Sequence, residues 1–296
     1  MGLIGLGLVG SALAERFAAA GFKVIGYDID GGKVDALRET GMADAHTPRE
    51  VAAQCRRVVL SLPNSYIVNE VVEGADGILE AARPGDVVMD TTTADPVMSV
   101  ALAGRLRRKD IRFLDATILG SSRQVREADV IVMAGGAADV FASCRDIFST
   151  FSRKAFHMGA SGKGAEAKLV VNLVLGLNRL ALAEGLTLGM KAGVHPERLL
   201  DVLREGAAYS RVMDTKGHKM VGGDFTPEAR LAQHLKDVGL ILDLGMRSGV
   251  KLPLSARHAQ LLRAGVDAGY GEEDNSAIIK VFRDMAGGES EMKNEK

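Results

Sequence analysis

Cysteine is scarce in this chain, and its two thiols, Cys55 and Cys144, lie far apart in the sequence. Neither has a partner at C-x-x-C or metal-ligand spacing, so neither a disulfide framework nor a redox pair is indicated. No signal peptide is recognisable at the N-terminus. These absences predict a reducing, cytoplasmic setting in which both cysteines act as small apolar packing residues.

An excess of charge is also missing. The formal net charge is −1, with 25% charged residues, and lysines and arginines are spread through both halves. A nucleic-acid partner is therefore not expected, because it would require a basic face or stripe. The six histidines show no H-x-x-x-H or H-E-x-x-H spacing, and no G-x-S-x-G is present. A metal site and acyl-transfer chemistry are likewise not predicted.

Long apolar runs are absent too. The longest, residues 169–183, is interrupted by Asn172, Asn178 and Arg179. It falls short of the roughly 20 apolar residues that span a bilayer, so it predicts a buried helix rather than a membrane anchor. The full length of 296 residues exceeds the usual size of about 100–200 residues per domain, which predicts two domains.

The N-terminus has the pattern of a dinucleotide-binding unit. A short apolar strand, residues 1–4, leads into a turn and an amphipathic helix that ends at Gly21. Its glycines fit G-x-G-x-x-G: the first makes a tight turn, the second lets the backbone approach a pyrophosphate, and the third lets helix pack on strand. The phosphates would bind at the helix N-terminus. The residues predicted to contact the cofactor here are Gly5, Leu6, Gly7, Leu8, Val9 and Gly10.

A second strand, residues 23–28, ends in Asp28, which follows Gly10 by 18 positions. The acid that binds the adenosine ribose is expected about 20 residues after the glycines. A carboxylate accepts hydrogen bonds from the ribose 2′-hydroxyl but repels a 2′-phosphate, so NAD is favoured. Lys33 lies close enough to weaken this inference, and NADP stays open.

Strands and helices then alternate to residue 158, which predicts a parallel, doubly wound Rossmann-type sheet. Leu62 and Pro63 follow a buried strand, and the loop they begin should lie along the cofactor edge. Thr91–Thr93 follow another strand, where they either cap the next helix, 96–108, or contact the nicotinamide side of the cofactor. A helix is expected over 68–82, and a polar loop over 117–124.

The second half reads as helices only, so the predicted domains are 1–161, which binds NAD(P), and 162–296, an all-helical substrate and dimerisation domain. Residues 165–192 are apolar nearly all round, which is typical of an interdomain or subunit-interface helix. On that helix Lys168 and Asn172 share a face, four residues apart. The glycines at 162 and 164 are expected to leave room for substrate and nicotinamide. Lys236 alone reads as a solvated helix lysine.

Four motifs together resemble the β-hydroxyacid dehydrogenases, the 3-hydroxyisobutyrate dehydrogenase-like group related to 6-phosphogluconate dehydrogenase, over essentially the whole chain. Gly5-Leu-Gly-Leu-Val-Gly matches the family's G-L-G-x-M-G, with Val9 in place of methionine. Asp90-Thr-Thr-Thr-Ala-Asp-Pro is similar to D-x-S-T-x-x-P. Gly162-Lys-Gly-Ala-Glu-Ala-Lys-Leu-Val-Val-Asn matches G-x-G-x-x-x-K-x-x-x-N, and Lys236-Asp resembles K-D-L.

The resemblance implies roles for single residues. Lys168 would be the catalytic lysine and Asn172 a substrate-orienting partner, while Thr93 and Lys236 would contact the cofactor. One motif departs from the family: D-A-P-V-S-G-G is replaced by Asp115-Ala-Thr-Ile-Leu-Gly-Ser, so that Leu119 stands at the usual serine. The expected substrate-binding residues are Gly120, Ser121, Ser122, Lys168, Asn172 and Lys236.

The resulting hypothesis is an NAD(P)-dependent oxidoreductase that interconverts a small 3-hydroxy acid and its semialdehyde or keto acid, of the 3-hydroxyisobutyrate or tartronate-semialdehyde type. Lys168 would serve as acid/base, which requires a partly desolvated amine with a lowered pKa. The alternatives are an imine or semialdehyde reductase of the same superfamily, or an inactive NAD-binding scaffold. The apolar helix predicts a homodimer or homotetramer.

Overall fold

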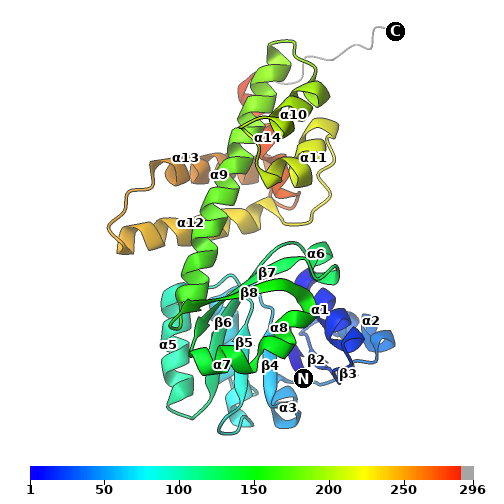
Figure 1. The fold of residues 1–296 in the computed structure, drawn as a ribbon, viewed down its shortest axis with the longest axis vertical. Coiled ribbons are helices and arrows are strands. Elements are labelled where there is room, and N and C mark those ends of the chain that lie inside the picture. The colour runs from blue at the N-terminus through cyan, green and yellow to red at the C-terminus, as the bar shows by residue number, and fades with distance from the viewer. Residues whose placement is uncertain (288–296) are drawn as a thin grey trace. The chain divides into compact units, whose positions relative to one another are not determined.

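The computed structural model describes residues 1–287, which form two compact units, Met1–Lys168 and the helices that follow from Leu169. The first unit is α/β and the second is helical (Figure 1). The predicted fold class is confirmed.

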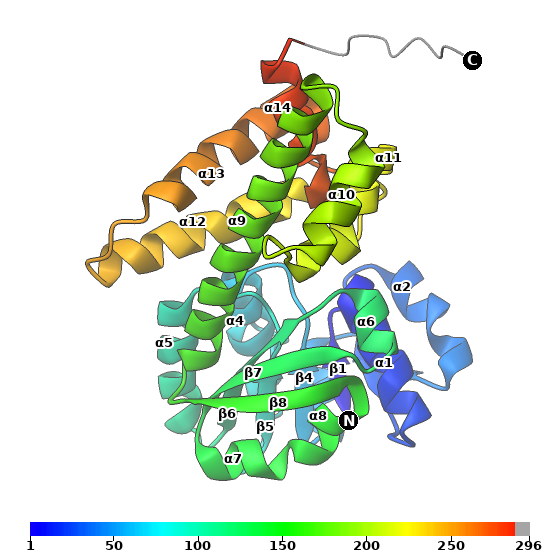
Figure 2. The same ribbon diagram turned by 45° about the horizontal axis from the view of Figure 1, so that its top comes forward.

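The first unit is built on one eight-stranded sheet with the order β3-β2-β1-β4-β5-β6-β7-β8. All neighbouring strands run parallel except β6 and β7, which are antiparallel. In Figure 2, β7 and β8 lie side by side at one end of the sheet. The strands are β1 (Gly2–Ile4), β2 (Ile25–Tyr27), β3 (Ala43–Asp44), β4 (Arg57–Leu60), β5 (Val87–Asp90), β6 (Arg112–Leu119), β7 (Val130–Gly136) and β8 (Ser152–Gly159).

Successive side chains of a strand point to opposite faces of the sheet. Because both faces are apolar here, helices cover both of them and two apolar cores form. Leu3 packs in one core and Ile4 in the other, and Met89 and Val88 divide in the same way. The first core is completed by α1 (Leu8–Ala19), α2 (Gly31–Ala36), α6 (Ser122–Arg126), α7 (Ala138–Ser143) and α8 (Arg145–Phe151). The second is completed by α3 (Pro48–Gln54), α4 (Ser65–Glu73) and α5 (Pro96–Arg107).

Two predicted segments of the first unit were wrong. The helix expected over 68–82 is interrupted, because α4 ends before Gly74, whose extended backbone leads to a short 3-10 helix, Ile78–Glu80. The polar loop expected over 117–124 is mostly regular secondary structure. β6 continues to Leu119, and α6 follows after Gly120, which has φ +148°. The predicted parallel sheet has one exception, because β7 returns antiparallel to β6.

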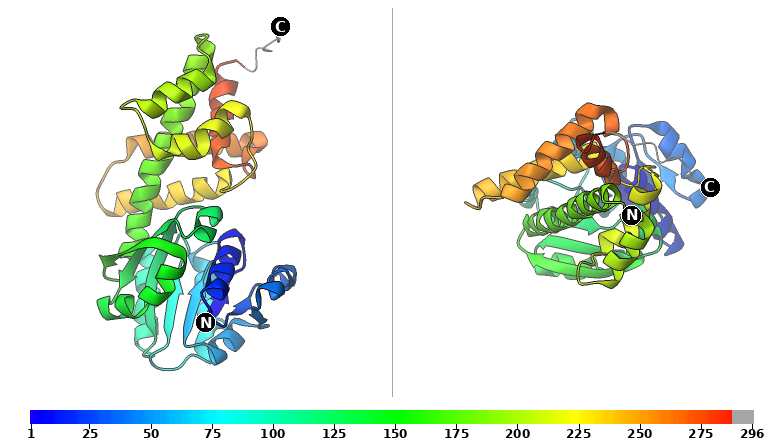
Figure 3. Two further views of the ribbon diagram at one scale, coloured as in Figure 1. Left: turned by 45° about the vertical axis from the view of Figure 1, so that its right-hand side comes forward. Right: turned by 90° about the horizontal axis from the view of Figure 1, so that it is seen from above.

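The second unit packs helices around its own apolar core. α12 and α13 run side by side in both views of Figure 3. α12 begins at Leu231, and a π-helical turn, Met213–Gly217, precedes α11. The helices are α9 (Lys163–Lys191), which starts in the first unit, α10 (Pro196–Glu205), α11 (His218–Gly222), α12 (Leu231–Arg247), α13 (Pro253–Gly265) and α14 (Ile278–Met285).

Helix α9 is long and apolar enough to cross a membrane by length and composition, and 39% of its most apolar window is buried inside the protein. It nevertheless carries the polar side chains Lys168, Asn172 and Arg179 at buried positions. Buried polar groups along a helix are typical of the core helix of a soluble protein rather than of a lipid-facing span.

Candidate functional site

The glycine-rich turn between β1 and α1 has the geometry that a dinucleotide requires. Gly5 has φ +91°, and a Cβ on it would overlap the carbonyl oxygen of Ser61, so only glycine fits this turn. A Cβ on Gly10 would overlap the carbonyl oxygen of Gly5, which explains the close approach of helix and strand. Gly7, in contrast, has no atom within 4 Å of its missing Cβ. The turn therefore leaves an open backbone surface at the N-terminus of α1, where an anion binds favourably.

Asp28 directly follows β2 and lies beside this turn. Its carboxylate accepts hydrogen bonds from the backbone N–H of Leu6, at 2.7 Å, and of Asp30, at 2.9 Å. The ammonium of Lys33 lies 3.3 Å from Asp28 Oδ1. The acid is thus fixed against the glycine turn, and a half-exposed cation stands next to it.

The ends of β4 and β5 are tied together by threonines at the same sheet edge. Thr92 Oγ1 accepts a hydrogen bond from Leu62 N at 3.1 Å, and Thr91 Oγ1 donates to Leu60 O at 2.6 Å. The cap of α5 is Asp95, whose side chain accepts from Val97 N. The interpretation of the threonines as helix caps was therefore wrong, because Asp95 caps α5, and the hydroxyls of Thr91 and Thr92 bond to the backbone at the end of β4.

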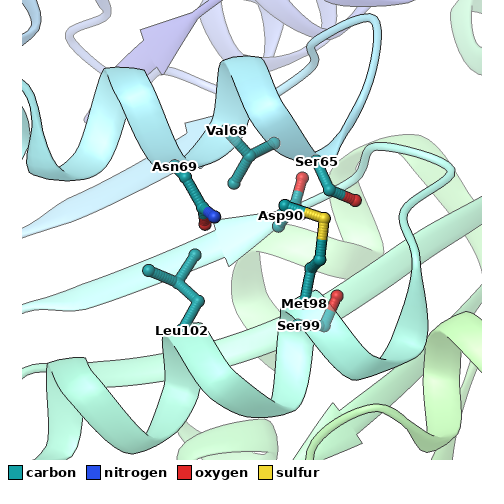
Figure 4. Close-up of a pocket in the computed structure, with 7 residues that line it drawn as sticks. All are labelled: Ser65, Val68, Asn69, Asp90, Met98, Ser99 and Leu102. Atoms are coloured by element: carbon teal, nitrogen blue, oxygen red, sulfur yellow. The ribbon is translucent and has the colours of Figure 1, made fainter.

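A small pocket lies behind this edge, between α4 and α5 and over the buried end of β5 (Figure 4). Asp90 forms part of it, and burial raises the pKa of this carboxyl to about 7. Ser99 Oγ, also buried there, has no hydrogen-bond partner among the residues that the structure describes. The lining residues are Ser65, Val68, Asn69, Asp90, Met98, Ser99 and Leu102.

Helix α9 begins at the level where β5 and β6 pair through Asp90 and Asp115. The carboxylate of Asp115 accepts from Gly162 N and Ala165 N, both at 2.8 Å. Lys168 follows one turn later, with 8% of its surface exposed.

The glycines at the start of α9 were expected to leave room for substrate, and this interpretation is corrected. A Cβ on Gly164 would overlap Asp115 O and lie 2.6 Å from Met133 O. Gly162 has φ +92°, and its Cβ would lie 2.6 Å from a methyl group of Val100. Both glycines are required by the close contact of α9 with strands and α5.

The second unit brings together Asn172, Lys236 and Asp237. Asn172 Nδ2 donates to Asp237 Oδ2 at 3.2 Å, and both side chains are buried. The ammonium of Lys236 lies 3.5 Å from Asp237 Oδ1. Asp237 thus links two predicted site residues, although the sequence assigned it no role; its only signal was its place directly after Lys236.

The predicted substrate loop has a different local structure from the one expected. Ser121 is the N-cap of α6, where it forms a reciprocal capping box with Gln124. Leu119 is the last residue of β6 and pairs with Ile131. Gly120 and Ser122 flank the cap, so the chain turns here directly from β6 into α6.

Two protein-family models match the chain. The first, the NAD binding domain of 6-phosphogluconate dehydrogenase, covers residues 1–159, and the second, the NAD-binding of NADP-dependent 3-hydroxyisobutyrate dehydrogenase, covers residues 162–282. The chain belongs to the β-hydroxyacid dehydrogenase family. The predicted family, NAD(P) as cofactor and the reaction class, NAD(P)-dependent oxidoreduction of a hydroxy acid, are confirmed.

Relatives of this β-hydroxyacid dehydrogenase extend over most of its length. It is 32% identical to 2-(hydroxymethyl)glutarate dehydrogenase of Eubacterium barkeri, over 86% of this chain and 85% of that protein. It is 31% identical to L-threonate dehydrogenase of Cupriavidus necator, over 82% of each. The crystal structure of 3-hydroxyisobutyrate dehydrogenase from Salmonella typhimurium superposes with a TM-score of 0.87, at 27% identity, over 95% of this chain and 99% of that one.

The residues of this dehydrogenase fit the cofactor that its family implies. The open backbone at Gly7 and the anchored carboxylate of Asp28 suit a pyrophosphate and a ribose, and both lie at the carboxyl ends of parallel strands. Within residues 1–287, no group of three or more His, Cys, Asp or Glu side chains is arranged to hold a metal ion. Cys55 and Cys144 are both free thiols and buried.

Proposed function

We propose that this dehydrogenase interconverts a small 3-hydroxy acid and its semialdehyde or keto acid, with Lys168 as the acid/base. The observation that carries the proposal is the position of Lys168: it is buried, and its helix starts at the same sheet edge as the glycine turn and Asp28. Titratable groups that are desolvated beside a ligand edge are candidates for proton transfer.

In the oxidation direction, bound NAD(P)⁺ supplies the acceptor for a hydride from the carbon that carries the hydroxyl. Lys168 Nζ accepts the hydroxyl proton as the C–O single bond becomes a carbonyl, and it returns that proton in the reduction direction. Asn172, four residues on along the same helix, lies on the face of Lys168, where its amide can orient the substrate oxygen. Asp237 holds that amide in place through its 3.2 Å hydrogen bond.

The substrate class follows from the names of the relatives together with the local chemistry. 2-(Hydroxymethyl)glutarate and 3-hydroxyisobutyrate both carry a hydroxyl β to a carboxylate. The residues proposed to bind that carboxylate are Gly120, Ser121, Ser122 and Lys236, since serine hydroxyls and an ammonium are donors for it. Because Ser121 already caps α6, Ser122 is the hydroxyl we favour for this contact.

The cofactor side divides into two groups of residues. The turn Gly5, Leu6, Gly7, Leu8, Val9 and Gly10 would hold the pyrophosphate, and Asp28 the adenosine ribose. Leu62, Pro63 and Thr93 would line the nicotinamide side, and the family resemblance makes Lys236 a further candidate for cofactor binding. NAD is favoured over NADP because the carboxylate of Asp28 repels a 2′-phosphate. The 3.3 Å contact with Lys33 moderates that repulsion.

We also propose that residues 162–296 mediate self-association, giving a homodimer or homotetramer in the cytoplasm. Apolar side chains of α9 recur on one helical face and are exposed in the single chain, among them Val170, Val174 and Leu188. Met246 and Leu254, near the connection between α12 and α13, are exposed as well. Exposed apolar side chains on helices of one unit are typical of subunit interfaces when they gather into a patch.

The test of the proposed chemistry is Lys168→Ala, with Lys163→Ala as its control. Lys163 occupies the first turn of the same helix but is exposed and paired with Glu166 at 2.6 Å. Loss of the acid/base should lower kcat by about 10²–10⁴ with little change in NAD(H) affinity, whereas Lys163→Ala should leave kcat unchanged. Turnover of Lys168→Ala near that of the wild type would remove the lysine from the mechanism.

Two other functions would give different results. An imine or semialdehyde reductase would consume NADPH or NADH with an imine or an aldehyde but would not oxidise 3-hydroxy acids. An inactive scaffold would bind NAD(H) without hydride transfer to any of these compounds. The buried lysine favours alcohol and carbonyl chemistry over an inactive scaffold, because a desolvated titratable group beside a ligand edge is a candidate for proton transfer.

A further inference from the structure

Asp115 is a buried carboxylate that the proposed reaction leaves without a role. It lies in β6 with 1% of its surface exposed. Its Oδ1 accepts from Gly162 N and its Oδ2 from Ala165 N, both at 2.8 Å. The first N–H groups of a helix have no partner within the helix, and the positive end of its dipole favours a negative charge. Asp115 therefore caps α9 from a strand 47 residues earlier in the chain.

The strands next to this carboxylate also contact the first turn of α9. Thr117 Oγ1 donates to Gly164 O and to Met133 O, each at 3.2 Å, so a second residue of β6 binds the same turn. A Cβ on Gly135 would lie 2.7 Å from Asp115 Oδ1, which means that the carboxylate fills the space above β7. The first turn of α9 is thus bound by the carboxylate of Asp115 and the hydroxyl of Thr117. The absence of a side chain at Gly164 lets this turn pack closely on the strands.

The neighbouring carboxyl of Asp90 indicates which of the two acids is charged. Asp90 is the strand partner of Asp115, and burial raises the pKa of Asp90 to about 7. Burial also raises the pKa of Asp115, but the N–H groups at the start of α9 counteract this. Two adjacent buried carboxylates repel each other, so the negative charge is favoured on Asp115, where the helix N-terminus compensates it.

We propose that Asp115 is a positioning residue for Lys168: its carboxylate fixes the first turn of α9 on β6 and thereby sets where the amine meets the substrate hydroxyl. This inference rests on the proposed acid/base role of Lys168. Lys168 follows Ala165 by three residues, so it lies on the same side of the helix one turn later. A displacement of this turn by about 1 Å would move the amine by a similar distance, which can cost about a hundredfold in rate.

The test is Asp115→Asn, with Asp86→Asn as a matched control. Asp86 is also a buried carboxyl, but it lies at the opposite end of β5, where it accepts from Arg83 N and pairs with Arg56. Asparagine keeps the size of Asp115 but loses the charge and one acceptor oxygen. In Asp115→Asn, kcat should fall about tenfold to a hundredfold while KM and the NADH dissociation constant change less than about twofold. Asp86→Asn should keep the wild-type kcat.

A double-mutant cycle separates positioning from a general structural effect. If Asp115 acts through Lys168, Asp115→Asn should lower kcat by less than about twofold in the Lys168→Ala background, since the group it positions is absent. An equal fold loss in both backgrounds would overturn the inference and leave the role of Lys168 intact. Wild-type turnover in Lys168→Ala alone would instead refute the proposed function, and the inference with it.

Two further measurements apply if Asp115→Asn does not fold. Gly164→Ala keeps Asp115 but pushes α9 away from Met133 O, and it should show the same loss of kcat and the same dependence on Lys168. In the wild type, hydrogen exchange at the amides of Gly162 and Ala165 should be slow, as expected of groups bonded to a buried carboxylate. Unprotected exchange at these two amides would contradict the inference directly.

Discussion

His258 should make this protein lose stability in mild acid. It lies on α13 with 2% of its surface exposed, and burial together with the nearby charge of Arg179 lowers its pKa from 6.5 to about 4. Its ring packs 5.1 Å from that of His234, and a Cβ on Gly176 would lie 2.8 Å from its Cε1. The site is tightly filled, so a proton on His258 cannot be accommodated by simple movement of the ring.

The size of the expected loss in unfolding free energy follows from the difference between the pKa of His258 in the folded and in the unfolded protein. Because the folded pKa is depressed, the neutral ring contributes its full stability above pH 6.5, and this contribution is lost as the pH falls toward 4. The shift of 2.5 pH units corresponds to about 3 kcal/mol in total, of which about 2 kcal/mol is lost by pH 5.

The assay is chemical denaturation between pH 5 and 8 for the wild type, His258→Gln and a control, His195→Gln. His195 is exposed before α10, so its variant should follow the wild type at every pH. The gap in free energy of unfolding between wild type and His258→Gln should be constant above pH 7 and shrink by about 2 kcal/mol at pH 5. A difference in unfolding free energy that stays constant from pH 5 to 8 would refute the reasoning, because the pKa of His258 would then be the same in the folded and the unfolded protein.

Two further predictions concern the cofactor and the assembly. Asp28→Asn should raise the ratio of kcat/KM with NADP to kcat/KM with NAD by about tenfold, because it removes the repulsion of a 2′-phosphate. Lys33→Ala should lower the same ratio. Unchanged ratios in both variants would show that these two residues do not determine the cofactor. Val174→Glu on α9 should weaken self-association in analytical ultracentrifugation, while Val202→Glu, also exposed but on α10, should not. A wild-type mass for the first variant would place the subunit contact elsewhere.

Local patterns predicted the parts of the fold that depend on neighbours in sequence. The glycines of the first turn, and Asp28 directly after β2, are found where their spacing placed them. Their geometry is set within a few residues, because a turn or a cap needs only its own φ angles and side chains.

Contacts between distant segments could not be predicted in this way. Asp115 reaches α9 over 47 residues, and Asn172 reaches Asp237 over 65. The antiparallel return of β7 likewise depends on pairing with β6 rather than on its own residues, which read as an ordinary buried strand. Gly164 was misinterpreted for the same reason: its role is set by the strand backbone that it contacts.

The central claim, hydride transfer from a 3-hydroxy acid, is tested most directly by the absorbance of NADH formed in the presence of a panel of 3-hydroxy acids. The panel should include 2-(hydroxymethyl)glutarate, L-threonate and 3-hydroxyisobutyrate, each measured with NAD and with NADP. The account predicts NADH formation with at least one of them, at a rate that Lys168→Ala lowers by about 10²–10⁴. Tight binding of NAD without reduction of the cofactor by any 3-hydroxy acid would contradict it.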